Sequence, residues 1–201
     1  MSTYARLAVA AVAVTAIVAT GCAGGQADTT SPELTPSATS QPTPSAAQAP
    51  PLTQSFTSTL HGISVSYPEG WTTQAATEPW TGAQSNFGDP PADFLYDPTL
   101  TDHLFVSIAS QPIGDSAPDE WVARELTLYE CTESESATVD GATGLIGADE
   151  CNAVAVTTDG RGYVVALYTS GDDPDAVAAY DRTWFEELLA TVQLRPEDAV
   201  D

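Results

Sequence analysis

Lysine is absent from this chain. The 201 residues include five arginines and 28 acidic residues, which gives a formal net charge of −23. Without lysine, the chain has no Schiff-base chemistry, no lysine clamp for phosphate and no Ser/Lys nucleophile pair. Nucleic acid and anionic lipid surfaces both repel a polyanion, so the charge excludes unaided binding to either.

Long apolar runs and catalytic motifs are missing as well. No apolar run is long enough for a permanent transmembrane helix. The chain has no G-x-S-x-G, H-E-x-x-H, Walker A or G-x-G-x-x-G pattern. The two histidines, His61 and His103, lie near Glu69 and Asp102 in the sequence. An envelope hydrolase that uses His61 or His103 with a carboxylate is therefore the alternative function. The main prediction is that the protein is not an enzyme and uses no cofactor.

The N-terminus has the features of an export signal. Arg6 precedes a short apolar stretch, residues 7–19, and small residues lead directly to Cys22. The sequence Ala-Thr-Gly-Cys at 19–22 resembles a bacterial lipobox. The resemblance implies that residues 1–21 are a signal peptide and that Cys22 carries acyl chains such as palmitate. Two acyl chains hold a protein firmly at a bilayer, so we expect a lipid-anchored protein on the extracytoplasmic face of the cell membrane. The alternative is an ordinary secretory signal in which Cys22 is incidental.

Two further cysteines, Cys131 and Cys151, remain after Cys22 is assigned to lipidation. Thiols in an oxidising compartment most simply pair with each other, so we predict a Cys131–Cys151 disulfide. Closing a loop of about twenty residues stabilises a fold by about 3 kcal/mol. A free reactive pair is the alternative, although the spacing is not the C-x-x-C of redox proteins.

The composition divides the rest of the chain into three parts. Residues 22–54 consist mainly of Ala, Thr, Ser, Pro, Gln and Gly, so we predict a disordered linker that follows the lipidated cysteine. Residues 55–196 alternate between apolar and polar positions, as a folded domain does, and residues 197–201 form an acidic tail.

The periodicity within the domain predicts an α+β fold with a largely antiparallel sheet. Residues 63–67 alternate as a half-buried strand, with residues 71–77 as a possible partner strand. Apolar stripes predict one helix over 118–130 and a last helix that is capped by Asp172 or Asp173 and has Pro174 in its first turn. The remaining predicted strands are residues 104–109, 138–139, 144–147, 153–157 and 163–168.

The opening of the domain resembles a known family. Residues 56–58 and 61–71 combine an alternating strand with Tyr-Pro and Gly-Trp pairs, and this pattern looks like the start of PsbP-like domains. These domains include LpqN-type lipoproteins of high-GC Gram-positive bacteria. The resemblance covers roughly residues 54–196 and implies an α/β/α sandwich around an antiparallel sheet. It also implies a binding or assembly module without catalytic residues.

Aromatic side chains supply the candidate ligand contacts. Trp121 and Trp184 lie on the predicted helical stripes and are expected in the core. Trp80 lies in a predicted loop, where aromatic residues more often contact ligands, and Phe94 and Tyr96 follow nearby. We therefore expect Trp80, Phe94 and Tyr96 to line a ligand site.

Clustered acids raise the question of a calcium site. Asp172, Asp173 and Asp175 flank Pro174, but their spacing is not that of an EF-hand. Helix capping and the helix dipole account for these acids without a metal, so no metal site is predicted. The sequence as a whole predicts a lipid-anchored, non-catalytic module of the cell envelope, with an envelope protein, a glycan or a lipid as its partner.

Overall fold

The computed structural model describes residues 48–82, 86–100, 103–148, 151–170 and 177–201. The predicted signal peptide, Cys22, most of the predicted linker and the Asp172–Asp175 segment lie outside these ranges. In the part that is described, no helix is both long and apolar enough to cross a membrane.

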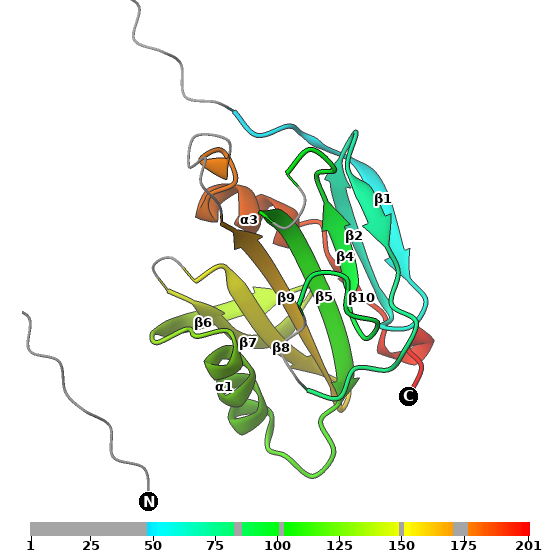
Figure 1. Cartoon of the computed structure of the whole chain (residues 1–201). Helices are drawn as coiled ribbons and strands as arrows, with labels where there is room; N and C mark the ends of the chain where they lie inside the picture. Colours follow the sequence, from blue (N-terminus) through cyan, green and yellow to red (C-terminus); the bar gives the residue numbers. More distant parts are fainter. Residues whose placement is uncertain (1–47, 83–85, 101–102, 149–150, 171–176) are drawn as a thin grey trace, which may run out of the picture. The chain divides into compact units, whose positions relative to one another are not determined.

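A seven-stranded antiparallel sheet forms the middle of the domain (Figure 1). Its two longest strands, β5 and β9, pair along their whole length and are apolar on both faces, as expected of central strands. The α+β class and the largely antiparallel sheet are therefore confirmed. In spatial order the strands are β3 (Thr72–Gln74), β4 (Asp93–Tyr96), β5 (Leu104–Pro112), β9 (Arg161–Thr169), β8 (Ala153–Thr158), β7 (Ala142–Gly147) and β6 (Ser134–Val139).

A second sheet has three strands, and it corrects one expectation. β1 (Leu52–Ser58), β2 (Ile63–Pro68) and β10 (Gln193–Leu194) lie in that order, so β1 rather than residues 71–77 pairs with β2. Residues 72–74 instead form β3, which pairs with β4 in the large sheet, while the buried ring of Trp71 packs with its centroid 5.6 Å from that of Trp184. β1 also begins at Leu52, within the stretch predicted as linker.

The helix α1 (Pro118–Leu128) covers one face of the large sheet. It begins at the predicted residue, and its apolar stripe packs on β8 and β9. The fit is close, since a Cβ atom on Gly162 would lie 2.4 Å from the ring of Trp121. The small residues of the sheet thus make room for the large side chains of the helix.

The helix α3 (Arg182–Leu189) packs with the core of the opposite face. Asp181 caps it, since the backbone N–H of Trp184 donates to the Asp181 carboxylate at 3.0 Å. α3 thus begins at Arg182 with Asp181 as its cap, whereas the predicted position of Pro174 and the predicted caps Asp172 and Asp173 lie outside the described residues. The three-stranded sheet contributes to the same core through Ile63 and Val65. The predicted arrangement of helices on both faces of an antiparallel sheet is confirmed.

The C-terminal residues are attached to the domain. The short 3-10 helix η1 (Pro196–Asp198) follows Arg195, whose N–H donates to the carbonyl of Gly62 at 2.7 Å. The N–H of Val200 donates to the carbonyl of Leu60 at 2.9 Å. Residues 195–200 thus close over the turn between β1 and β2, although residues 197–201 were predicted to be a tail.

Candidate functional site

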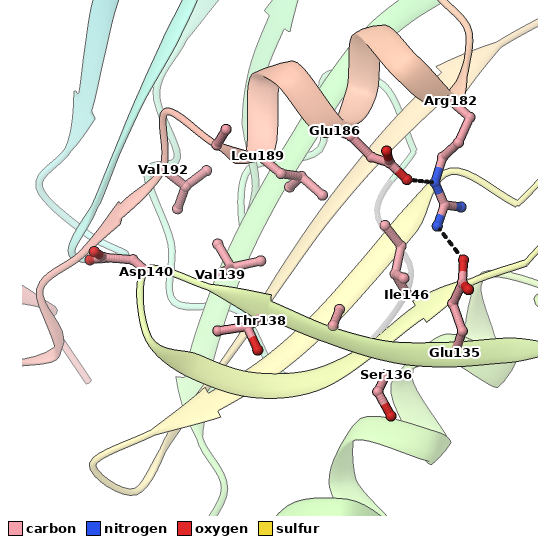
Figure 2. Close-up of a pocket in the computed structure, with 12 residues that line it drawn as sticks. Glu135, Ser136, Thr138, Val139, Asp140, Ile146, Arg182, Glu186, Leu189 and Val192 are labelled. Carbon is pink, nitrogen blue, oxygen red and sulfur yellow. Dashed lines mark hydrogen bonds and ion pairs between the residues drawn. The ribbon is translucent and has the colours of Figure 1, made fainter.

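A groove of about 490 Å³ lies between β6 and α3 (Figure 2). Its floor is apolar and its rim is acidic, with Arg182 as the cation at one end. The lining residues are Glu135, Ser136, Ala137, Thr138, Val139 and Asp140 with Ile146 from the sheet, and Arg182, Glu186, Leu189, Ala190 and Val192 from α3 and the residues that follow it.

Arg182 joins the two walls of this groove. Its guanidinium donates to Glu186 on its own helix at 2.7 Å and to Glu135 on β6 at 3.0 Å. It also donates to the carbonyl of Gly147 at the end of β7. These contacts tie α3 to the β6–β7 hairpin and fix the spacing between the groove's walls at that end.

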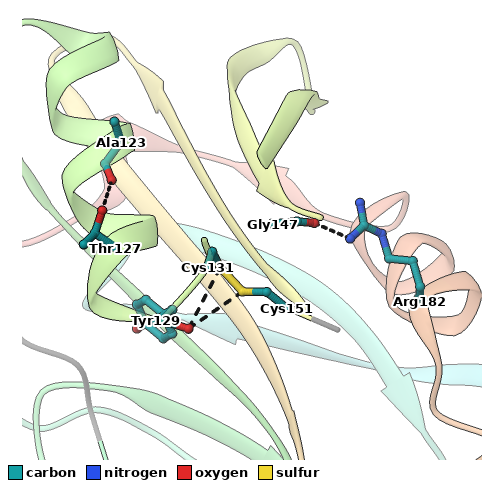
Figure 3. The surroundings of a disulfide bond; sticks show 7 residues. All are labelled: Ala123, Thr127, Tyr129, Cys131, Gly147, Cys151 and Arg182. Carbon is teal, nitrogen blue, oxygen red and sulfur yellow. Dashed lines mark hydrogen bonds between the residues drawn. A yellow bond between two sulfur atoms is a disulfide. The ribbon is translucent and has the colours of Figure 1, made fainter. Parts of the chain in front are cut away.

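The disulfide lies next to Gly147, the residue whose carbonyl accepts the hydrogen bond from Arg182 (Figure 3). Cys131 and Cys151 are paired with a Cα–Cα distance of 5.5 Å, which agrees with the predicted pairing. A Cβ atom on Gly147 would lie 2.7 Å from the sulfur of either cysteine. The bond therefore packs directly against the residue whose carbonyl receives Arg182, and it restrains both ends of the β6–β7 hairpin.

β6 is an edge strand with one open side. The hairpin turn at Asp140 and Gly141 has positive φ angles of 47° and 81°, which is the geometry of a two-residue type I′ turn. In such a hairpin, the odd-numbered residues from Val139 back to Glu135 bond to β7. The N–H of Ala148 donates to the carbonyl of Glu133 at 2.9 Å, which continues this alternation.

The even-numbered residues of β6 consequently direct their backbone groups away from the sheet. Ser134, Ser136 and Thr138 are all exposed. Within the ranges that the structure describes, no strand lies beyond β6. Three of the six residues of β6 thus present unpaired N–H and C=O groups beside the groove.

His61 lies in a buried polar cluster. Its side chain has 1 % exposure, and the N–H of Ser110 donates to its Nδ1 at 3.1 Å. Nε2 therefore carries the ring proton, which it donates to the carbonyl of Pro91 at 3.0 Å. Both ring nitrogens are engaged inside the protein.

Ser110, a neighbour of His61, is also committed to internal hydrogen bonds. Its hydroxyl donates to the backbone carbonyl of His61 at 2.9 Å and accepts from Arg161 at 3.0 Å. Arg161 in turn forms an ion pair with Asp201. Ser110 has 3 % exposure, so a substrate has no route to the hydroxyl oxygen in this conformation.

Asp93 is the carboxylate that acts on His61, in place of the Glu69 suggested by the sequence. Burial raises the pKa of Asp93, and hydrogen bonds from Ser58 and from the N–H of Ala76 partly offset that rise. Burial lowers the pKa of His61, and the charge of Asp93 opposes this change. Both groups are thus favoured in their neutral forms, as expected of polar groups enclosed by a fold.

His103 is distant from this cluster. It is exposed and directly precedes β5, whereas Ser110, the residue bonded to His61, lies near the other end of β5. Seven residues of strand separate the two positions by roughly 23 Å. The structure therefore does not bring the two histidines together.

The predicted aromatic contacts are mostly core residues, which corrects the expectation of a ligand site around Trp80. Trp80 has 3 % exposure and packs edge-on against Trp121 at 6.4 Å, and Phe94 has no exposed surface. Tyr96 is half-buried and packs against Phe87 at 5.0 Å. Trp80 and Phe94 thus stabilise the domain and present almost no surface to a ligand.

Sequence reasoning missed the groove and most of the His61 cluster. The cluster joins Asp93, Ser110 and Arg161, which are far apart in the chain, and no local pattern brings them together. The edge position of β6 depends on the order of strands in the sheet. The only local signal was the polar stretch at 134–136, which indicates a strand that is not buried on both faces.

Comparison with known proteins found only limited similarity. No protein-family model and no curated protein matches the chain. The solution structure of cyanobacterial PsbP (CyanoP) from Synechocystis sp. PCC 6803 is similar at 16 % identity and a TM-score of 0.44, over 70 % of this chain and 91 % of that chain. PsbP is the family that residues 56–71 resemble.

A second similar structure is a crystal structure from Bacteroides thetaiotaomicron VPI-5482, at 13 % identity and a TM-score of 0.37. The alignment covers 71 % of this chain but 48 % of that one, so this chain spans about half its length. At these TM-scores the alignments add no argument to the fold class, which rests on the strand pairing described above.

Proposed function

We propose that the protein is a lipid-anchored, extracytoplasmic binding or assembly module of the cell envelope and that it has no catalytic activity of its own. The groove beside β6 is the observation that carries this proposal. It combines an apolar floor, charged side chains and unpaired backbone groups on one open surface. Such a surface suits binding, and its lining residues include no histidine, cysteine or lysine.

The His61 cluster supports the non-catalytic part of the proposal. A hydrolase that uses a histidine as its base requires that histidine to reach the attacking nucleophile or water next to the substrate. Here the His61 ring is enclosed, and the Ser110 hydroxyl donates to a backbone carbonyl. The cluster joins β2 and its preceding turn to β5, so its role is structural.

The anchored location rests on the sequence of the first 54 residues. An acylated Cys22 followed by a proline-rich linker would hold the domain away from the bilayer, as in the LpqN-type lipoproteins that the domain's opening resembles. The net charge of −23 keeps the domain itself off an anionic lipid surface. The partner on this account is another envelope component.

Metabolic labelling tests the anchor. Cells that express the full chain receive a palmitate analogue, and a Cys22→Ser variant is the matched control. The proposal expects label in the membrane fraction for the unchanged chain and none for the variant. Equal labelling of both chains, or release of the unchanged chain into the medium, contradicts the anchor.

Thermal unfolding tests the binding function. The full chain is heated with phospholipid vesicles, cell-wall fragments, Ca²⁺ or soluble envelope proteins. A ligand at a hundredfold excess over its Kd stabilises the folded state by about 2.7 kcal/mol, which moves the midpoint by several degrees. A shift with one envelope component and no turnover of it supports the proposal. Turnover that Ser110→Ala abolishes would instead establish a hydrolase.

A further inference from the structure

We infer that the groove between β6 and α3 binds an extended, basic polypeptide segment, which pairs with β6 as an eighth strand of the large sheet. This inference deepens the proposed binding function and rests on it. It names the chemistry of the partner, the edge that the partner uses and the direction in which its side chains point.

The backbone of β6 supplies the first argument. Folded proteins usually protect sheet edges by making the edge strand short or by covering it. β3, at the other edge of the large sheet, follows this rule with three residues. β6 has six residues, and Ser134, Ser136 and Thr138 direct their N–H and C=O groups to the open side. These groups match the requirements of an added strand.

The side chains beside that edge supply the second argument. Residues on a strand alternate between the two faces of its sheet, so every other side chain of an added strand would point toward α3. On that face the groove is lined by the half-buried Ala137 and, below it, by the largely buried side chains of Val139, Ile146 and Leu189. Arg182 lies at one end of the groove. Asp140 from the hairpin turn and Val192 from the segment after α3 line the other end (Figure 2). From Ser134 to Thr138 the edge is roughly 13 Å long, which accommodates a segment of about five residues.

Charge determines which polypeptide fits. The rim carries the carboxylates of Glu135, Asp140 and Glu186 against the single guanidinium of Arg182. Lysine or arginine side chains can lay their apolar stems on the floor and place their charges at this rim. A second copy of the chain is a poor occupant, because two molecules of formal charge −23 repel each other and would bring their two Glu135 carboxylates to the same interface.

Labelled peptides test the inference by fluorescence anisotropy with the full chain. The probe is a capped eight-residue peptide of alternating lysine and valine. One control peptide has glutamate in place of lysine, and another is the lysine peptide methylated at the nitrogens of its four central residues. The lysine peptide is expected to bind, and each control is expected to bind at least about tenfold more weakly, because one loses charge complementarity and the other loses its N–H donors.

Two substitutions at one position test the site. Ser136→Pro removes an N–H that points away from β7 and leaves the hairpin ladder intact, as proline on an edge strand can. Both variants lose the serine hydroxyl, but Ser136→Ala keeps the backbone N–H that Ser136→Pro removes. The proline variant is expected to lose at least about tenfold in affinity, and the alanine variant is expected to bind as the unchanged chain does. If the proline variant fails to fold, the methylated peptide on the unchanged chain gives the same comparison.

Each outcome bears on one of the two proposals. If the lysine peptide binds and neither Ser136→Pro nor methylation weakens it, strand addition at β6 is wrong, while the binding function stands. If the glutamate peptide binds equally well, the basic partner is wrong. If no peptide binds but another envelope component shifts the thermal midpoint, the inference fails alone. If no component produces a shift either, the proposed function fails with it.

Discussion

The cluster around His61 and the groove beside β6 both bring polar groups next to apolar surface, but they differ in how those groups are satisfied. In the cluster, the ring nitrogens of His61 and the hydroxyl of Ser110 find partners inside the protein. Along β6, the outward N–H and C=O groups have no partner strand in the described ranges. The first region is closed and the second is open.

This difference separates stability from function. A histidine, a serine and an aspartate lie near one another in the closed region, yet burial favours the neutral forms of His61 and Asp93. The hydrogen bonds among these residues hold the three-stranded sheet against the seven-stranded sheet. The open region contains no group of unusual reactivity, and its unpaired backbone can bond to another molecule. Substitutions in the closed region should therefore change stability, and substitutions in the open region should change binding.

The largest effect is expected for His61→Ala. The change leaves a cavity and removes the partners of the Ser110 N–H and the Pro91 carbonyl, so the free energy of unfolding should fall by about 4 kcal/mol. Denaturant titration measures this loss, and His103→Ala, at an exposed histidine, is the control with an expected change within about 0.5 kcal/mol. Affinity for the lysine peptide should be unchanged while the variant is folded. A small loss of stability would show that the cluster is not structural.

Removal of the disulfide should have the next largest effect. Replacing Cys131 and Cys151 together by serine opens a loop with a sequence separation of 20, which costs about 3 kcal/mol in the free energy of unfolding. Reductant added to the unchanged chain should give the same value and leave the variant unaffected. Because the bond packs on Gly147 beside Arg182, peptide affinity should fall as well. Unchanged stability in both experiments would contradict the pairing.

The Asp93 carboxyl should give a pH dependence of stability. Burial raises its pKa above the ordinary value of 3.8, so the folded state keeps its proton to a higher pH than the unfolded state does. The stability from this group is complete below pH 3.8 and is lost as the pH rises through the higher folded pKa.

Asp93→Asn isolates that dependence. Asparagine does not titrate and keeps an oxygen for the N–H of Ala76. The stability of the variant relative to the unchanged chain should therefore increase from acid pH toward neutral pH, as measured by unfolding at a series of pH values. A relative stability that stays constant or decreases over this range would show that burial does not raise the pKa of Asp93.

The smallest effect on stability is expected at the rim of the groove. Glu186→Gln breaks an exposed pair with Arg182 one helical turn away, which should cost about 0.4 kcal/mol in the free energy of unfolding. Affinity for the lysine peptide should fall a few-fold. Glu187→Gln makes the same charge change at the next residue, which does not line the groove, and is the control. Equal losses of affinity in both variants would indicate general attraction by the acidic surface.

Local patterns in the sequence predicted much of this fold. Alternation located β2, the apolar stripe located α1, and the small number of cysteines in a chain expected to be exported predicted the disulfide. Local patterns failed where a distant residue decides the outcome. Trp80 packs edge-on against Trp121 on a later helix and is buried, and β2 pairs with β1, a strand that begins within the stretch predicted as linker.

The site could be predicted even less. Whether β6 is open depends on which strand lies beside it, and no residue within β6 encodes that. The same holds for the rim, where Glu135 and Arg182 meet across 47 residues of chain. Chemical type alone favoured histidines and aromatic residues as site candidates, whereas the groove consists of an unpaired backbone edge, apolar side chains and ordinary acids.

Amide hydrogen exchange along β6, with and without the lysine peptide, tests the account most directly. In the free protein, the N–H groups of Ser136 and Thr138 should exchange much faster than those of Glu135 and Ala137, which bond to β7. Saturation with the peptide should slow exchange at Ser136 and Thr138. Peptide binding that leaves these two amides unprotected, or that protects the other edge of the sheet instead, would contradict the account.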